Sequence, residues 1–411
     1  MQRISNISGH VKTAKSPSDD VVICCAVRTA VCKAKKGSFK DTMPEDMLAP
    51  LFEALVKRTG VNPKDVGDVC IGNVLQPGGG ALSSRIGQLL SGWPADVPVM
   101  TVNRQCSSGL QACANIAAQI EAGYIDVGVG GGVESMTNND MQATLNPEQI
   151  SENVFEHEGA RNCLLPMGIT SENVAAKYGI SRDAQDTMAV ESHAKAAKAQ
   201  QAGLFREEIV PVRAKIRTTA ADGSEDVVEK VVDADEGIRA ATTMASLQKL
   251  KPAFQKGGTT TAGNSSQVSD GAALVLMARR SAAERLRLPI IGRFVSFSAV
   301  GVPPEVMGIG PAVAIPAALR MAGLTIKDID VFEVNEAFAS QATYCMQDLG
   351  IPKQKLNPKG GAIALGHPLG CTGARQIATL MPELKRTGGK YGVVSMCIGT
   401  GMGAAAVIER L

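Results

Sequence analysis

The chain is organised around the stretch Val102-Asn-Arg-Gln-Cys-Ser-Ser-Gly-Leu-Gln111. Residues 99–102 have a strand-like pattern, and from Leu110 to Ile120 apolar residues recur at the spacing of one buried helix face. The sequence therefore predicts a strand, a short turn carrying Cys106, and a helix. Unpaired backbone N–H groups at that helix N-terminus favour an anion such as the Cys106 thiolate. The alternative is that Cys106 is a small, buried and inert residue.

The same arrangement recurs in the last third of the chain. Cys106-Ser-Ser-Gly-Leu-Gln-Ala112 aligns with Cys371-Thr-Gly-Ala-Arg-Gln-Ile377, and Gly60–Val69 aligns with Gly323–Val331. The glycine-rich strand predicted after Cys106 also has a counterpart, which follows Cys371 at the same spacing. Alternation of strands and helices in both copies predicts an α/β fold of two pseudo-symmetric halves, with mainly parallel sheets covered by helices. Ligand sites in such sheets lie beyond the carboxyl ends of strands, so loops of the second half should face Cys106.

The composition changes near Thr137, beyond which charged residues and Asn/Glu-rich turns become frequent. We interpret the following residues as an inserted, mostly surface-exposed loop domain. The expected segments are an N-terminal targeting tail over 1–19, an N-terminal half over 20–137 that is completed by 257–287, the inserted domain over 138–256, and a C-terminal half over 288–411.

Charge and composition exclude several classes of function. The formal net charge is +2, from 42 basic and 40 acidic residues, which gives no electrostatic case for nucleic-acid binding. No apolar run reaches the roughly 18 residues that a transmembrane helix needs. The ten cysteines include no Cys-x-x-Cys pair, which argues against zinc ribbons and thioredoxin-type sites and favours a reducing compartment.

Three loops of the second half carry polar residues that chemistry could use. Asn335 and Glu336 follow a predicted strand, although either could instead be a helix N-cap. His367 lies between a glycine and a proline, on backbone that cannot be ordinary helix, in the loop that pairs with the Cys106 turn through the repeat. A structural histidine is the alternative there. Cys397 ends a strand among glycines, whose N–H groups can converge on an oxyanion.

These motifs together resemble the thiolase family, from about residue 20 to the last residue. The residues that carry the resemblance are Asn103–Gly109, Asn335–Ala339, Gly366–Arg375 and Cys397–Gly403. The longer motifs Gly72–Gly78 and Met167–Val174 are most similar to peroxisomal members of the family. The resemblance implies a thiolase-like fold of two similar α/β halves with an inserted loop domain. It also implies a homodimer, with a tetramer as the alternative.

The resemblance implies CoA-dependent cleavage of 3-ketoacyl-CoA in fatty-acid β-oxidation. Cys106 would attack the 3-keto carbon and carry the acyl group as a thioester, while His367 takes its proton. Cys397 would protonate the departing enolate of acetyl-CoA and then deprotonate the incoming CoA. Asn335 would hold an oxyanion-hole water beside His367, and the N–H groups of Cys106 and Gly399 would form a second oxyanion hole.

The family also implies residues that bind the substrate. Met167 would line the thioester pocket, Ser266 would touch the pantetheine arm, and Arg239 would touch the adenine. No metal or redox cofactor is implied, because CoA and acyl-CoA are substrates. The alternatives are a biosynthetic acetoacetyl-CoA thiolase, a decarboxylating ketoacyl synthase, or a non-catalytic acyl-CoA- or lipid-binding protein on the same scaffold.

The first residues resemble a targeting signal. Arg3-Ile-Ser-Asn-Ile-Ser-Gly-His-Val11 resembles the N-terminal peroxisomal nonapeptide, with Val11 in place of the more usual Leu or Ala. A mitochondrial presequence is the alternative, because this segment is basic, contains serines and is poor in acidic residues. We therefore expect a peroxisomal protein whose residues 3–11 bind an import receptor.

Overall fold

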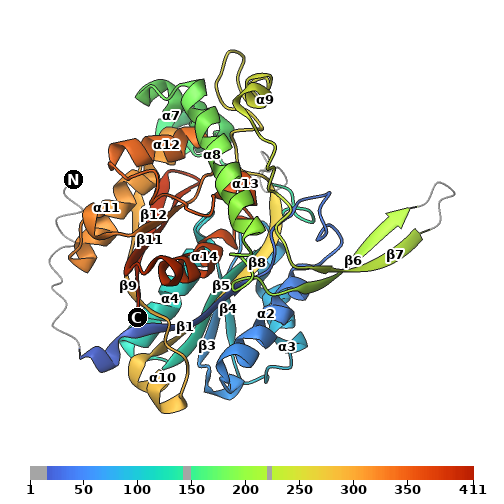
Figure 1. Cartoon of the computed structure of the whole chain (residues 1–411), viewed down its shortest axis with the longest axis vertical. Helices are drawn as coiled ribbons and strands as arrows, with labels where there is room; N and C mark the ends of the chain where they lie inside the picture. Colours follow the sequence, from blue (N-terminus) through green and yellow to red (C-terminus); the bar gives the residue numbers. More distant parts are fainter. Residues whose placement is uncertain (1–15, 142–149, 220–224) are drawn as a thin grey trace.

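Two sets of four strands with the same pairing pattern form the framework of the molecule (Figure 1). The structure is a computed structural model and describes residues 16–141, 150–219 and 225–411. The N-terminal set contains, in order across the sheet, β3 (Asp68–Gly72), β5 (Val127–Ser135), β8 (Ser269–Arg279) and β1 (Val21–Arg28). The C-terminal set contains, in the corresponding order, β10 (Val331–Val334), β11 (Tyr391–Ile398), β12 (Met402–Arg410) and β9 (Gly292–Gly301). In both sets the first pair is parallel and the next two are antiparallel, which confirms the internal repeat.

The two sets are joined where β1 pairs with β9 at Val22 and Ile23. Short β2 (Cys32–Lys33) pairs with β8, and β4 (Val99–Val102) extends the sheet beyond β3. The prediction of mainly parallel sheets is wrong. Only β3–β4, β3–β5 and β10–β11 are parallel among the strands of this described sheet. β8 runs opposite to β3 and β5, and β12 runs opposite to β10 and β11. β12 does so because the chain reverses tightly at Thr400 and Gly401, where φ is +66° and +90°.

Two central helices bring the predicted site together. α4 (Ser108–Ala122) and α14 (Thr372–Thr387) are the matched helices of the repeat, and they pack on each other at the centre of the view in Figure 1. A β-carbon at Gly109 would lie 2.6 Å from the carbonyl oxygen of Gly370, and one at Gly373 would overlap the backbone of Leu110. Glycine therefore lets the two helix N-termini approach closely. This contact sets the Cys106 turn against the turn that follows His367.

Further helices cover the two halves. On the N-terminal half these are α2 (Pro44–Thr59), α3 (Ala81–Leu90) and α10 (Arg280–Leu286), and on the C-terminal half α11 (Gly310–Ala322), α12 (Ala339–Asp348) and α13 (Ala362–Leu365). α2 ends at Gly60, which has φ +73°. Pro50 lies inside this helix, which starts at Pro44. The 3₁₀ helices of the described residues include η1 (Pro17–Asp19), η2 (Pro63–Asp65), η3 (Pro77–Gly80), η6 (Pro304–Ile309) and η7 (Ile326–Asp328).

Pro304–Ala322 is, among the described residues, the one helical stretch long and apolar enough to cross a membrane by length and composition. It is 61% buried, because its α11 portion packs against β9 and β12. The stretch therefore serves as a core helix of the C-terminal half.

The segment between β5 and β8 carries its own elements. They are α5 (Asn153–Glu156), α6 (Glu158–Asn162), α7 (Met167–Tyr178), α8 (Arg182–Gln201), β6 (Val212–Thr219), β7 (Glu225–Val232) and α9 (Met244–Gln248). α8 packs against α12 and α13, whereas the β6–β7 hairpin projects from the body of the molecule in Figure 1. Buried ion pairs join this segment to both halves: Glu208 contacts Arg28 and Lys359, each at 2.7 Å.

Candidate active site

Cys106 lies in the predicted turn, between β4 and α4. The preceding residue, Gln105, has φ +47°, a left-handed conformation that is uncommon outside glycine and that marks a constrained turn. Cys106 is 3% exposed and clusters with Leu75, Met136 and Leu369. Because Leu369 comes two residues after His367, the Cys106 turn packs directly on the turn that carries His367.

The Cys106 thiol is protonated in this structure at neutral pH. Burial raises its pKa to about 11, and the N–H groups of Gly399 and of Cys106 itself only partly offset this effect. Desolvation thus opposes the effect of the helix N-terminus on this thiol and outweighs it in this structure. The Gly399 N–H lowers the pKa of the thiol by hydrogen bonding to it, so this N–H lies beside the sulfur, where it could stabilise an oxyanion.

His367 is held so that one ring nitrogen can act as a base. Its Nδ1 lies 2.6 Å from Oγ1 of Thr372, and that hydroxyl donates to the carbonyl oxygen of Pro368 at 2.9 Å. The hydroxyl must therefore accept from Nδ1–H, which leaves a lone pair on Nε2. Asn335 Nδ2 lies 3.2 Å from Nε2. Burial and the positive charge of Arg375 lower the pKa of His367 to about 3, so the ring is neutral at physiological pH.

Thr372 was not among the residues predicted to act at the site. It occupies the first position of α14, five residues after His367, where its hydroxyl returns to the histidine ring. A hydroxyl residue at the predicted start of that helix was the available signal. Whether the Thr372 hydroxyl reaches the His367 ring depends on the conformation of the turn between the two residues, which the sequence pattern does not predict.

Asn335 and Glu336 have different roles. Asn335 follows β10, is buried, and donates its backbone N–H to Ser395; its Oδ1 has no hydrogen-bond partner among the described residues. That oxygen can therefore accept from a bound water or substrate. Glu336 accepts from Ser192, Asn357 and Ile363, so its carboxylate is a structural acceptor. The N-cap alternative is wrong for both, because α12 begins at Ala339.

Cys397 lies inside β11 and is fully buried. Burial raises the pKa of its thiol well above the ordinary value, and the nearby Cys106 adds to the effect, so the two sulfur atoms interact electrostatically. Cys397 clusters with Met307 and Ala337, and Met167 packs against this cluster. The structure therefore brings Met167 to the second cysteine.

The predicted binding residues do not all lie together. Ser266 is half-buried, and its N–H donates to the carbonyl oxygen of Ala337 at 3.0 Å, which places it beside the Cys397 cluster. Arg239 is exposed, and its backbone N–H donates to Nδ1 of His193 at 3.1 Å. No described hydrogen bond or ion pair of Arg239 reaches the catalytic candidates.

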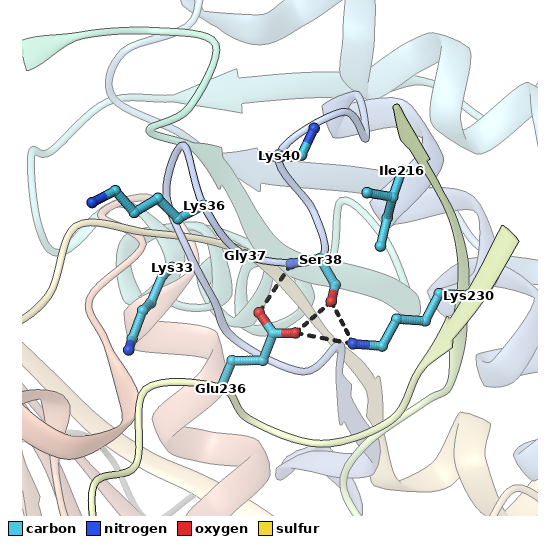
Figure 2. A pocket seen from close by; sticks show the side chains of 8 residues that line it. All are labelled: Lys33, Lys36, Gly37, Ser38, Lys40, Ile216, Lys230 and Glu236. Carbon is cyan, nitrogen blue, oxygen red and sulfur yellow. Dashed lines mark hydrogen bonds and ion pairs between the residues drawn. The ribbon is translucent and has the colours of Figure 1, made fainter. Parts of the chain in front are cut away.

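A separate cavity of about 370 Å³ lies between the turn after β2 and the β6–β7 hairpin. Its lining residues are Lys33, Lys36, Gly37, Ser38, Lys40, Ile216, Lys230 and Glu236 (Figure 2). Glu236 accepts from the N–H and hydroxyl of Ser38 and from Lys230, while the Lys33 and Lys36 side chains point away from it. The carboxylate is thus used within the protein, and none of the catalytic candidates lines this cavity.

Comparisons with known proteins agree with the geometry. The model of the thiolase N-terminal domain matches residues 21–281, and that of the thiolase C-terminal domain matches residues 288–410. The chain is 55% identical to the human peroxisomal 3-ketoacyl-CoA thiolase, over 100% of this chain and 99% of that protein. It is 59% identical to rat peroxisomal 3-ketoacyl-CoA thiolase B, over 96% of this chain and 92% of that protein.

Solved structures give the same picture. The dimeric peroxisomal thiolase of Saccharomyces cerevisiae superposes with a TM-score of 0.88 at 50% identity, over 97% of this chain and 99% of that one. A second structure of the yeast protein, with a TM-score of 0.77 at 45% identity over the same shares of the two chains, is described as five-layered and built from two core domains of identical topology. The two matched strand sets and the central helices described above fit that architecture.

Proposed function

This chain belongs to the thiolase family, and we propose that its Cys106, His367, Cys397, Asn335 and Gly399 carry out the family's reaction. The enzyme is an acyltransferase with 3-ketoacyl-CoA thiolase activity. It cleaves a 3-ketoacyl-CoA with CoA, giving acetyl-CoA and a shortened acyl-CoA in fatty-acid β-oxidation. The observation that carries the site assignment is the neutral His367, whose unprotonated Nε2 contacts Asn335 Nδ2 at 3.2 Å, in the turn that packs on Cys106.

In the first half-reaction, the Cys106 sulfur bonds to the 3-keto carbon while its proton moves to His367 Nε2. The N–H groups of Cys106 and Gly399 stabilise the oxyanion that forms; one such donor typically contributes about 10²–10³-fold to the rate. The carbon–carbon bond then breaks, and Cys397 gives its proton to the departing enolate. This leaves acetyl-CoA, an acyl thioester on Cys106 and a thiolate on Cys397.

In the second half-reaction, the Cys397 thiolate takes the proton of the incoming CoA thiol. The CoA sulfur attacks the acyl carbon, and His367 returns its proton to Cys106 as the thioester bond breaks. Asn335 acts in the first half-reaction. Its Oδ1, which has no partner among the described residues, would hold a water beside His367 that stabilises the thioester oxygen of the departing acetyl-CoA enolate. Met167, Ser266 and Arg239 would bind the thioester, the pantetheine arm and the adenine.

The test is a CoA-dependent cleavage assay on acetoacetyl-CoA and on a long-chain 3-ketoacyl-CoA, followed by the appearance of acetyl-CoA. We expect turnover on at least one substrate and none in Cys106→Ala. Tight binding of acyl-CoA without turnover by the parent protein would instead support the non-catalytic carrier.

The protein is peroxisomal, like its human and rat relatives. We propose that it forms a homodimer and that residues 3–11, which lie outside the described residues, bind an import receptor. We also propose the division into a tail (1–19), two halves (20–137 with 257–287, and 288–411) and an inserted domain (138–256). A fluorescent reporter fused to residues 1–20 should enter peroxisomes. Peroxisomal import that survives Arg3→Glu with His10→Ala would refute the role of residues 3–11.

A further inference from the structure

Gln267 links the turn that carries His367 to the loop at Gly237. Its side-chain nitrogen Nε2 donates to the carbonyl oxygen of Gly237 at 2.9 Å and to that of Ile363 at 3.0 Å, and it lies 3.3 Å from that of Ala364. The backbone carbonyl oxygen of Gln267 accepts a hydrogen bond from the backbone N–H of His367 at 3.0 Å. One residue thus contacts the catalytic histidine through its backbone and two other segments through its side chain.

The chemistry of these contacts requires an amide nitrogen. All three oxygens around Nε2 are backbone carbonyls, which can only accept hydrogen bonds, so the NH₂ group must face them. Two of them belong to α13, a single turn whose last carbonyls lack partners within the helix. Gln267 therefore caps α13 from outside.

The turn that leaves α13 leads straight to the histidine. Gly366, between α13 and His367, has φ +107°, and a β-carbon there would overlap the side chain of Ser269. The hydroxyl of Ser269 donates to the carbonyl oxygen of Gln267 at 2.7 Å. The backbone of His367 is thus fixed by Gln267 and by a turn that only glycine fits, while its ring is fixed by Thr372 and Asn335.

We propose that Gln267 is a positioning residue for His367, on the assumption that the proposed function holds. By closing α13 and accepting the His367 N–H, it sets where Nε2 lies relative to Cys106. Through Gly237 it also ties this turn to the segment that leads to Arg239. Gln267 itself does not touch the His367 ring in any described contact, so it acts through the backbone.

The test compares variants that keep the shape of the side chain but change its donors. Gln267→Met removes the donors, and Gln267→Glu places a carboxyl group against the three carbonyl oxygens. The matched controls are Gln200→Met and Gln200→Glu. Gln200 is also half-buried, and its Nε2 donates a hydrogen bond to a single backbone carbonyl oxygen, that of Asp235, at 3.0 Å. The measurements are kcat, KM for each substrate, and the rate at which iodoacetamide inactivates Cys106.

A displacement of a catalytic group by about 1 Å can cost on the order of 100-fold. We therefore expect Gln267→Met to lower kcat by about 10- to 100-fold, with smaller changes in KM, while the iodoacetamide rate stays within about twofold of the parent because burial sets the pKa of the Cys106 thiol. In Gln267→Glu, kcat should fall relative to the parent as pH rises, because an ionised carboxylate repels the carbonyl oxygens whereas a protonated one can donate. Both Gln200 variants should stay within about twofold of the parent.

The proposal is overturned if both Gln267 variants keep kcat within about twofold of the parent and share its pH profile, even if their melting temperatures fall. If Gln267→Met does not fold, the pH profile of Gln267→Glu decides alone. A parent protein that shows no turnover would refute the proposed function instead.

Discussion

The resting site holds a neutral thiol and a neutral imidazole. Burial raises the pKa of Cys106 to about 11 and, with Arg375, lowers that of His367 to about 3. Proton transfer therefore accompanies attack on the substrate, and no ion pair waits for it. The negative charge that forms on the substrate oxygen in this buried site is then stabilised by the N–H groups of the proposed oxyanion hole.

This pair of neutral groups predicts the pH dependence of Cys106 alkylation. A thiol pKa raised to about 11 means that the thiolate fraction grows by about tenfold per pH unit at any lower pH. The rate of inactivation by iodoacetamide should therefore keep rising from about pH 6.5 to about 9.5, without a bend near the usual histidine pKa of about 6.5. Cys106→Ala corrects for labelling elsewhere, above all at Cys163, which is partly exposed. A plateau from neutral pH upward would indicate a preformed thiolate–imidazolium pair.

The proposed reacting groups could be predicted from the sequence, but the groups that hold them could not. Cys106, His367 and Cys397 stand out because each lies at a predicted turn or strand end, in motifs that match through the repeat or the family. Thr372 lies in such a motif but shows only a hydroxyl at a predicted helix start, and Gln267 lies in none of the motifs. The importance of both comes from side-chain directions set by two non-helical turns. The pKa values depend on burial on all sides, which a local pattern cannot report.

At the scale of secondary structure, the helical elements were easier to predict than the direction of the strands. The apolar spacing after Cys106 predicted α4, and the aligned copy predicted α14. Buried strands such as β8 and β12 are apolar on both faces, so their patterns carry no direction. The expectation of mainly parallel strands was based on the alternation of strands and helices. It fails where two consecutive strands are connected without a helix and pair antiparallel, as β11 and β12 do.

The buried cluster around Glu208 should stabilise the contact between both halves and the intervening segment. Its carboxylate binds Arg28 and Lys359, and all three side chains are at most 1% exposed. Glu208→Ala leaves two buried cations with one acceptor fewer, so we expect the free energy of unfolding to fall by about 3–5 kcal/mol. Denaturant unfolding followed by circular dichroism measures this change.

The neighbouring Glu207 supplies the control. Its ion pair with Lys385 is exposed on both sides, so Glu207→Ala should change the free energy of unfolding by at most about 1 kcal/mol. Burial alone would raise the pKa of Glu208, but Lys359 and Arg28 hold it below its usual range. The stabilisation is therefore present above the unfolded carboxyl pKa of about 4.3 and is lost as pH falls through the lower folded value. Equal losses in the two variants would contradict the account.

At the scale of the whole molecule, the site exists only where the two halves meet. Cys106 comes from the N-terminal set of elements, whereas His367, Asn335, Cys397 and Gly399 come from the C-terminal set. The close crossing of α4 and α14 at Gly109 and Gly373 brings them together. The duplication that appears in the sequence as two aligned cysteines thus yields a site that is not symmetric. Cys106 is the proposed nucleophile, while Cys371, its counterpart, is buried in the core.

The central claim is that Cys106 carries the acyl group while Cys397 only moves protons. Each variant, Cys106→Ala and Cys397→Ala, is mixed with a 3-ketoacyl-CoA radiolabelled in its acyl chain, quenched in acid, and assayed for covalent label. Cys397→Ala should still acquire label at Cys106, more slowly by about 10²–10⁴-fold, because it lacks only a general acid–base group. Cys106→Ala should acquire none while still binding CoA thioesters. Label on Cys106→Ala, with none on Cys397→Ala at any time, would reverse the two roles and contradict the account.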